Sequence, residues 1–121
     1  MSLLAAVLAL GPVPEVTPAA SVLLGGQPQA VAVAGDRAYV ADVDGLSVYA
    51  LDGLRLLGHA STPGAARDVT LLPDGRVCVA DGREGLAIFD VTRPDQPRLS
   101  RRIPVPGGAR RVRASNRGIA V

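Results

Sequence analysis

Carboxylates gather in two short turns of the chain. Asp42 and Asp44 lie in an Asp-Val-Asp-Gly segment, and Asp81 and Glu84 lie in an Asp-Gly-Arg-Glu-Gly segment. Such oxygens suit Ca²⁺, which binds about six to eight of them. Each turn alone supplies too few ligands, and Asp and Gly are favoured in tight turns because Asx side chains bond to the backbone. We therefore expect structural turns and no cofactor, with a rim that binds Ca²⁺ or another polar ligand as the alternative.

The chain has one histidine, His59, and one cysteine, Cys78. Any Ser-His-Asp or Cys-His nucleophile would have to use His59. That residue falls in a run expected to form an exposed outer strand, so we predict no catalytic residue. A lone cysteine gives neither a disulfide framework nor a thiol metal site. We expect Cys78 to be a small apolar residue at the position of Val40 in a sequence repeat described below, with a reactive thiol as the alternative.

Basic residues, all of them arginine, concentrate near the C-terminus. Residues 1–97 carry a net charge of −5 and residues 98–121 carry +7, which gives the chain its +2. A solvated strand face explains this charge, and an anion-binding patch is the alternative. Nucleic acid is not an expected partner because no aromatic side chains are interleaved for base stacking. The arginines of the candidate patch are Arg101, Arg102, Arg110, Arg111 and Arg113.

The chain repeats itself. Residues 31–42 align with residues 69–81, and residues 112–121 begin a third copy. The first two copies begin at Val31 and Val69, and each is followed by a Gly-Leu pair, whose leucines are Leu46 and Leu86. These anchors give a period of about 40 residues, which is typical of a four-stranded propeller blade.

Within each repeat the pattern is that of short strands. Apolar residues alternate with small or polar ones, which places one side of each strand against a core. The 10 prolines and 14 glycines disfavour helices. We predict an all-β fold of four-stranded antiparallel blades in an incomplete ring; a β-helix solenoid competes, but its coils are usually shorter. The third and fourth runs of the two repeats are residues 46–51 and 54–60, then 86–91 and 98–105.

Repeat 2 resembles the LVIVD repeat, whose units read Ala-Arg-Asp-Val, Val-Ala-Asp and Gly-Leu-x-Ile-x-Asp-Val-Thr-x-Pro-x-x-Pro-x-Leu in order. The matching segments are residues 66–69, 79–81 and 85–99. Repeat 1 matches at residues 39–42 and 45–46 and departs from the pattern at residues 50–53. The resemblance implies a β-propeller that is exported or surface-associated in bacteria and archaea, in a family whose members mostly lack an assigned activity.

The N-terminus carries an apolar run of eight residues after Met1 and Ser2. Its length fits the apolar core of a signal peptide and is too short to span a bilayer, although no positive residue precedes it. We expect export to the periplasm, cell surface or medium and no transmembrane helix; the protein is cytoplasmic if this run is not a signal. The expected segments are a signal or apolar segment 1–20, a closing outer strand 21–27, blades 28–64 and 65–107, and a partial repeat 108–121.

A closed propeller has about four to eight blades. Two repeats and part of a third are present here, so we expect a fragment of a longer protein, with the remaining blades in a missing C-terminal part. Such a fragment exposes an unpaired strand edge and should be marginally stable alone.

Three functions are compatible with these features. The first is a non-enzymatic scaffold that contacts proteins or cell-envelope polymers, because the repeats share no catalytic residue. The second is a propeller hydrolase or lactonase with a metal in the central channel, which would use rim carboxylates such as Asp42 and Asp81. The third is an anion-binding module built on the arginine-rich end, which predicts salt-sensitive binding.

Overall fold

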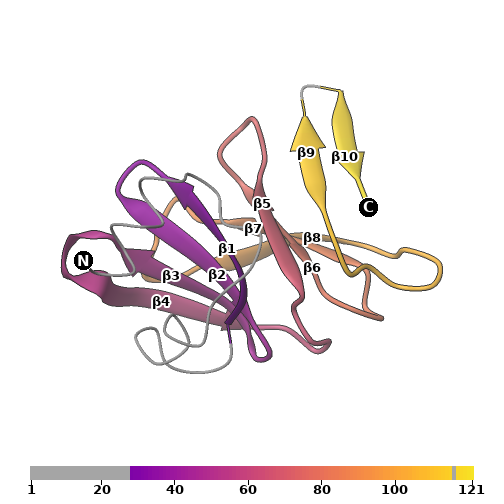
Figure 1. The fold of residues 1–121 in the computed structure, drawn as a ribbon, viewed down its shortest axis with the longest axis horizontal. Coiled ribbons are helices and arrows are strands. Elements are labelled where there is room, and N and C mark those ends of the chain that lie inside the picture. Colours follow the sequence, from indigo (N-terminus) through magenta and orange to yellow (C-terminus); the bar gives the residue numbers. More distant parts are fainter. Residues whose placement is uncertain (1–27, 116) are drawn as a thin grey trace.

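The computed structural model describes residues 28–115 and 117–121. The predicted segments 1–20 and 21–27 lie outside the described residues. The described chain forms two four-stranded antiparallel sheets in which the strands follow one another in sequence order, and then a two-stranded hairpin. Figure 1 shows the sheets fanning out side by side, with the hairpin beyond the second. The all-β prediction is therefore confirmed, and the ring is not closed.

Each sheet is one propeller blade. The strands of blade 1 are β1 (Pro28–Ala34), β2 (Arg37–Asp42), β3 (Gly45–Ala50) and β4 (Arg55–Ser61), with the short 3-10 turn η1 (Asp52–Leu54) before β4. The strands of blade 2 are β5 (Asp68–Leu71), β6 (Val77–Ala80), β7 (Leu86–Asp90) and β8 (Arg98–Ile103). The hairpin that begins the third repeat consists of β9 (Arg113–Ser115) and β10 (Gly118–Ala120).

The core lies between the blades. Alternate residues of a strand point to opposite faces of a sheet, so each blade has one face toward the preceding blade and one toward the next. Leu46 and Val48 of blade 1 pack with Val79 and Phe89 of blade 2 in one buried cluster. The opposite face of blade 2 packs against Val112 at the start of the third repeat in a second cluster. Most members of these clusters are Ala and Val, so the blades approach each other through small side chains.

The register relates the two blades residue by residue. Ala41 pairs with Leu46 in blade 1, and Ala80 pairs with Leu86 in blade 2. Asp42 and Asp81, which follow these alanines, therefore occupy equivalent positions at the ends of the second strands. Both blades also contain a bulge near the middle of the third and fourth strands. The repeat seen in the sequence is thus a repeat of three-dimensional structure.

A glycine begins the third strand of blade 1 and stands just before that of blade 2. Gly85 has φ +83°, and a Cβ there would overlap the carbonyl oxygen of Ile103 on β8. Gly45 has φ +145°, and a Cβ there would overlap the carbonyl oxygen of Ala60 on β4. The Gly of each Gly-Leu pair thus allows both a positive φ and a close approach of the fourth strand.

Candidate functional site

The two candidate carboxylate turns lie at the same end of neighbouring blades. Antiparallel order places the β2–β3 turn, the β6–β7 turn and the connections between blades at this end, which we call the connection end (Figure 1). The turns after the first strands and the connections to the fourth strands lie at the opposite end. The sequence prediction of a shared rim position for Asp42 and Asp81 therefore agrees with the register.

Asp42 caps its own turn and reaches one further side chain. Its Oδ1 accepts hydrogen bonds from the backbone N–H groups of Asp44 and Gly45, at 2.8 and 2.9 Å. Its Oδ2 accepts a hydrogen bond from the Ser47 hydroxyl at 3.1 Å. The Ser47 Oγ also lies 2.8 Å from Nδ1 of His59. The only histidine in the sequence, His59, is therefore hydrogen-bonded to Ser47, which is in turn hydrogen-bonded to Asp42.

This order differs from that of a hydrolytic triad. In a triad the imidazole lies between the carboxylate and the nucleophile, so that it can accept the hydroxyl proton. Here the Ser47 hydroxyl lies in the middle and donates to Asp42, so the His59 Nδ1 acts as the donor toward Ser47 when that hydrogen bond forms. Ser47 is 4% exposed, which leaves little room for a substrate carbonyl. The cluster therefore orients side chains within blade 1. His59 itself is exposed on β4, as the sequence predicted.

The same blade carries Tyr49. Burial raises the pKa of the Tyr49 hydroxyl, and the negative charge of Asp42 raises it further. The Tyr49 phenol thus stays protonated throughout the neutral range.

Asp81 has a different environment from Asp42. Its side chain is 0% exposed. The Asp81 Oδ2 accepts hydrogen bonds from the N–H of Gly64 at 3.3 Å and from Nη1 of Arg102 at 3.1 Å, whereas Oδ1 has no hydrogen-bond partner among the described residues. Gly64 belongs to the connection between the blades, so Asp81 ties its blade to the preceding one. A Cβ at Gly64 would overlap the carbonyl oxygen of Asp81, which explains the glycine there.

The remaining metal candidates add no converging ligands. Asp44 is exposed and contributes its N–H to Asp42. Glu84 is exposed and contributes its N–H to the carbonyl oxygen of Asp81 at 3.1 Å. Within residues 28–115 and 117–121, no group of three or more His, Cys, Asp and Glu side chains is close enough to hold a metal ion.

The structure separates the five arginines of the candidate basic patch. Arg102 is paired with Asp81, and Arg113 donates from Nη1 to Oδ2 of Asp68 at 2.7 Å. Arg101, Arg110 and Arg111 are exposed on the described part of the chain and have no ion-pair partner there. They do not share one element: Arg101 lies in β8, the outermost strand of blade 2, whereas the other two precede β9.

Asp68 is a structural residue that the sequence analysis did not single out. Its Oδ1 accepts the N–H of Val69 at 2.9 Å, and its Oδ2 accepts the N–H of Val112 at 3.0 Å. Val112 belongs to the third repeat, so this buried carboxylate joins two blades. One signal was available: repeat 1 has Ala30 at this inward-facing position, and a carboxyl at an apolar position needs a partner.

Cys78 is fully buried in the cluster between blade 2 and the third repeat. Burial raises the pKa of its thiol to about 11. The expectation of an apolar core residue agrees with this placement. Its repeat position was wrong, however: Cys78 pairs with Ile88 as Tyr39 pairs with Val48, so its counterpart is Tyr39 and not Val40.

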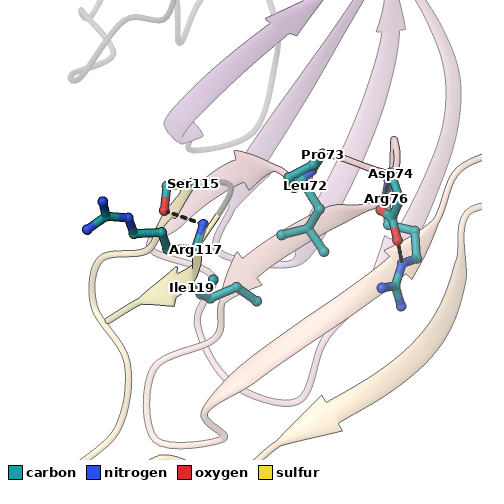
Figure 2. A pocket seen from close by; sticks show the side chains of 8 residues that line it. Leu72, Pro73, Asp74, Arg76, Ser115, Arg117 and Ile119 are labelled. Atoms are coloured by element: carbon teal, nitrogen blue, oxygen red, sulfur yellow. Dashed lines mark hydrogen bonds and ion pairs between the residues drawn. The ribbon is translucent and has the colours of Figure 1, made fainter.

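Two of the pockets that the described residues line are relevant to binding. The larger, with a volume of about 770 Å³, lies at the connection end and includes Arg67, Arg83 and Arg110 in its lining. The smaller, of about 350 Å³, lies between the β5–β6 turn and the β9–β10 hairpin. Figure 2 shows Leu72 and Ile119 in the middle of the smaller pocket, with the Arg117 guanidinium directed away from it.

Comparison with protein families gives one match. The LVIVD repeat family matches residues 25–48 and 63–104, more than half of the chain. The chain is therefore a β-propeller repeat protein and belongs to the LVIVD repeat family, which confirms the resemblance stated from the sequence. No curated protein and no solved structure matches it. No helix within the described residues is long and apolar enough to cross a membrane.

Proposed function

We propose that this chain is part of a non-enzymatic propeller scaffold that binds a protein or a cell-envelope polymer through the loops at the connection end of its blades. One observation carries the proposal: the carboxylates that recur at equivalent positions serve structure. Asp42 caps its turn, and Asp81 holds the connection between blades. A repeat-based catalyst would instead leave such groups free to act on a substrate.

The proposal includes export. It is supported by the apolar run at residues 3–10. The test is a fusion of residues 1–27 to alkaline phosphatase, which is active only outside the cytoplasm. We expect activity, and we expect Leu4→Arg with Leu8→Arg to abolish it because a signal core must be apolar. An inactive fusion at normal expression levels would contradict export.

The scaffold role is tested by cosedimentation. Purified protein is mixed with isolated cell envelopes of the source organism, with and without protease treatment of the envelopes. A scaffold for proteins loses its bound fraction after protease, and a scaffold for polymers keeps it. Arg67→Gln and Arg83→Gln, two single variants at the connection end, should each bind less, whereas Arg55→Gln on β4 serves as the charge-matched control. Equal binding by all variants would argue against a site at the connection end.

The alternative is a hydrolase or lactonase with a metal in the central channel. It predicts turnover of 4-nitrophenyl acetate or of a γ-lactone that depends on added Ca²⁺, or that is lost in Ser47→Ala and His59→Ala. The scaffold proposal predicts no turnover above that of these variants, with or without the ion. Turnover that depends on Ser47, His59 or Ca²⁺ would replace the scaffold proposal with the enzyme.

A further inference from the structure

The larger pocket brings together three arginines from three separate loops. Arg67 comes from the connection between blades 1 and 2, Arg83 from the β6–β7 turn, and Arg110 from the connection to the third repeat. We propose that this pocket binds a small ligand with two or more anionic groups, either carboxylates or phosphates. The inference does not depend on the scaffold role, because a binding pocket can serve a scaffold or an enzyme alike.

The repeat places two of these arginines at equivalent positions. Arg67 and Arg110 each stand just before the start of their repeats, and one residue separates each from the first valine, Val69 or Val112. Both side chains are exposed, and neither has a hydrogen-bond or ion-pair partner among residues 28–115 and 117–121. Successive blades therefore present unpaired guanidinium groups at the same rim, and both groups line one pocket.

Several backbone N–H groups of the pocket lining are already bonded within the protein. Gly82 and Ala109 line it, and each donates its N–H to the carbonyl oxygen of the other, at 2.9 and 2.7 Å. Gly64 also lines the pocket, and its N–H is bonded to Asp81. These N–H groups already have acceptors within the protein. The guanidinium groups of Arg67, Arg83 and Arg110 are the positively charged donors that the lining offers to a ligand.

The charge of the lining favours an anion. Three arginines and one carboxylate, Glu84, give the lining a formal charge of +2. The buried Asp81 next to Gly82 of the lining is neutralised by Arg102. Guanidinium groups bind carboxylates and phosphates through paired, charge-assisted hydrogen bonds. A ligand with two or more anionic groups could therefore engage guanidiniums from more than one loop.

The volume and composition of the pocket restrict the ligand further. A volume of about 770 Å³ is typical of a site for a small molecule. No aromatic side chain of the described residues lines the pocket, so it offers no stacking surface for a base. The smaller pocket is a weaker candidate, because its Arg76 is paired with Asp74 and its Arg117 points away (Figure 2).

The test is isothermal titration calorimetry at low ionic strength, with citrate as the carboxylate probe and pyrophosphate as the phosphate probe. We expect one site per chain for at least one probe, and the probe that binds identifies the chemistry. Arg67→Gln and Arg110→Gln should each weaken binding about tenfold or more, because each removes hydrogen bonds to a charged group. Arg55→Gln, an exposed residue on β4 outside the pocket, makes the same charge change and should alter affinity less than about twofold.

Circular dichroism checks that each variant is folded. Arg83→Gln, in an exposed turn, keeps the test decisive if either of the other variants fails to fold. The inference is overturned if neither probe binds, or if Arg55→Gln weakens binding as much as the pocket variants do. It is also overturned if heparin binds more tightly than either probe and if Arg55→Gln weakens heparin binding as much as the pocket variants do. Such behaviour is expected of a charged surface and not of a pocket.

Discussion

His59 and Arg102 occupy the same position in successive blades. His59 pairs with Ser47 across β3 and β4, and Arg102 pairs with Ala87 across β7 and β8. Each side chain interacts with the carboxylate at the end of the second strand of its blade. His59 is linked to Asp42 through the Ser47 hydroxyl, and Arg102 donates a hydrogen bond directly to Asp81. The repeat therefore keeps the carboxylate and varies its partner.

The Asp81–Arg102 pair should be essential for stability. Arg102→Ala leaves a fully buried carboxylate without its cation, and breaking a buried pair in this way costs about 3 kcal/mol or more. Because Arg102 is partly exposed, we expect a loss at the lower end of this range in the free energy of unfolding, measured by urea denaturation.

Two further variants isolate this effect. Arg93→Ala breaks an exposed ion pair in which Nη2 of Arg93 lies 3.7 Å from Oδ2 of Asp95. This change should lower the free energy of unfolding by less than about 1 kcal/mol. Adding Asp81→Asn to Arg102→Ala should recover part of the stability, because the buried charge is then gone. A double variant less stable than Arg102→Ala would show that Asp81 stabilises the fold even without its arginine.

Asp68 should hold the third repeat against blade 2. Asp68→Ala removes the acceptor of the buried Val112 N–H and should cost about 2 kcal/mol, since a buried donor is left unsatisfied. Amide hydrogen exchange should accelerate at Val112. Arg113→Ala removes only an exposed partner of Asp68 and should cost less than about 1 kcal/mol. If both variants cost the same, the ion pair and not the amide contact joins the blades.

Gly64 should tolerate no side chain. A Cβ there overlaps the carbonyl oxygen of Asp81, which is held by the β6–β7 turn. We expect Gly64→Ala to lower the thermal midpoint by an amount equivalent to about 3 kcal/mol. Gly75→Ala is the matched control: Gly75 has φ +91° and no atom within 4 Å of the added Cβ, so the cost is about 1 kcal/mol of backbone strain. Equal losses would mean that the blade connection relaxes around the added methyl group.

Alkaline pH should destabilise the protein through Cys78. The pKa of this thiol is about 11 in the folded protein, against its ordinary value of 9.0 in the unfolded chain. The folded state therefore keeps a proton that the unfolded state releases between these values. The contribution to stability is full below pH 9 and falls by about 1.4 kcal/mol per unit as the pH rises from about 9 to about 11.

The measurement is urea denaturation at pH 8, 9 and 10, with Cys78→Ala as the comparison. The variant should lose the part of the slope that the thiol contributes. A wild-type slope identical to that of the variant would exclude Cys78 as its source. Modification of the folded protein by a thiol reagent at pH 8 should also be slow, because the thiol is buried and protonated.

Most of the fold could be predicted from the sequence repeat. The spacing of its anchors, Val31 to Val69 and Leu46 to Leu86, together with alternating apolar positions, predicts four-stranded blades, and the structure confirms them. Boundaries were less accurate. The fourth run of repeat 2 was predicted as residues 98–105, but β8 ends at Ile103, because Pro104 has no N–H for the ladder.

The polar contacts between elements were not predictable. Asp42 and Asp81 align in sequence and were given one interpretation, yet one caps a turn and the other is buried against a connection. The partners of Asp81, which are Gly64 and Arg102, lie 17 and 21 residues away from it in the sequence. Val112, the partner of Asp68, lies 44 residues away. Turn chemistry is local and therefore readable in a sequence. The Asp81–Arg102 pair instead joins separate strands of one blade, and the contacts of Asp81 with Gly64 and of Asp68 with Val112 join a blade to its neighbours.

The two faces of a blade have one further consequence, which concerns how such proteins change in size. Positions equivalent to Leu46 and Leu86 face the next blade, and those of Val79 and Phe89 face the preceding one. One copy of the repeat thus carries both of the surfaces that form the contact between neighbouring blades. A gene duplication of one whole repeat would insert a blade with two matching surfaces, so that length can change by whole blades while every such contact is kept.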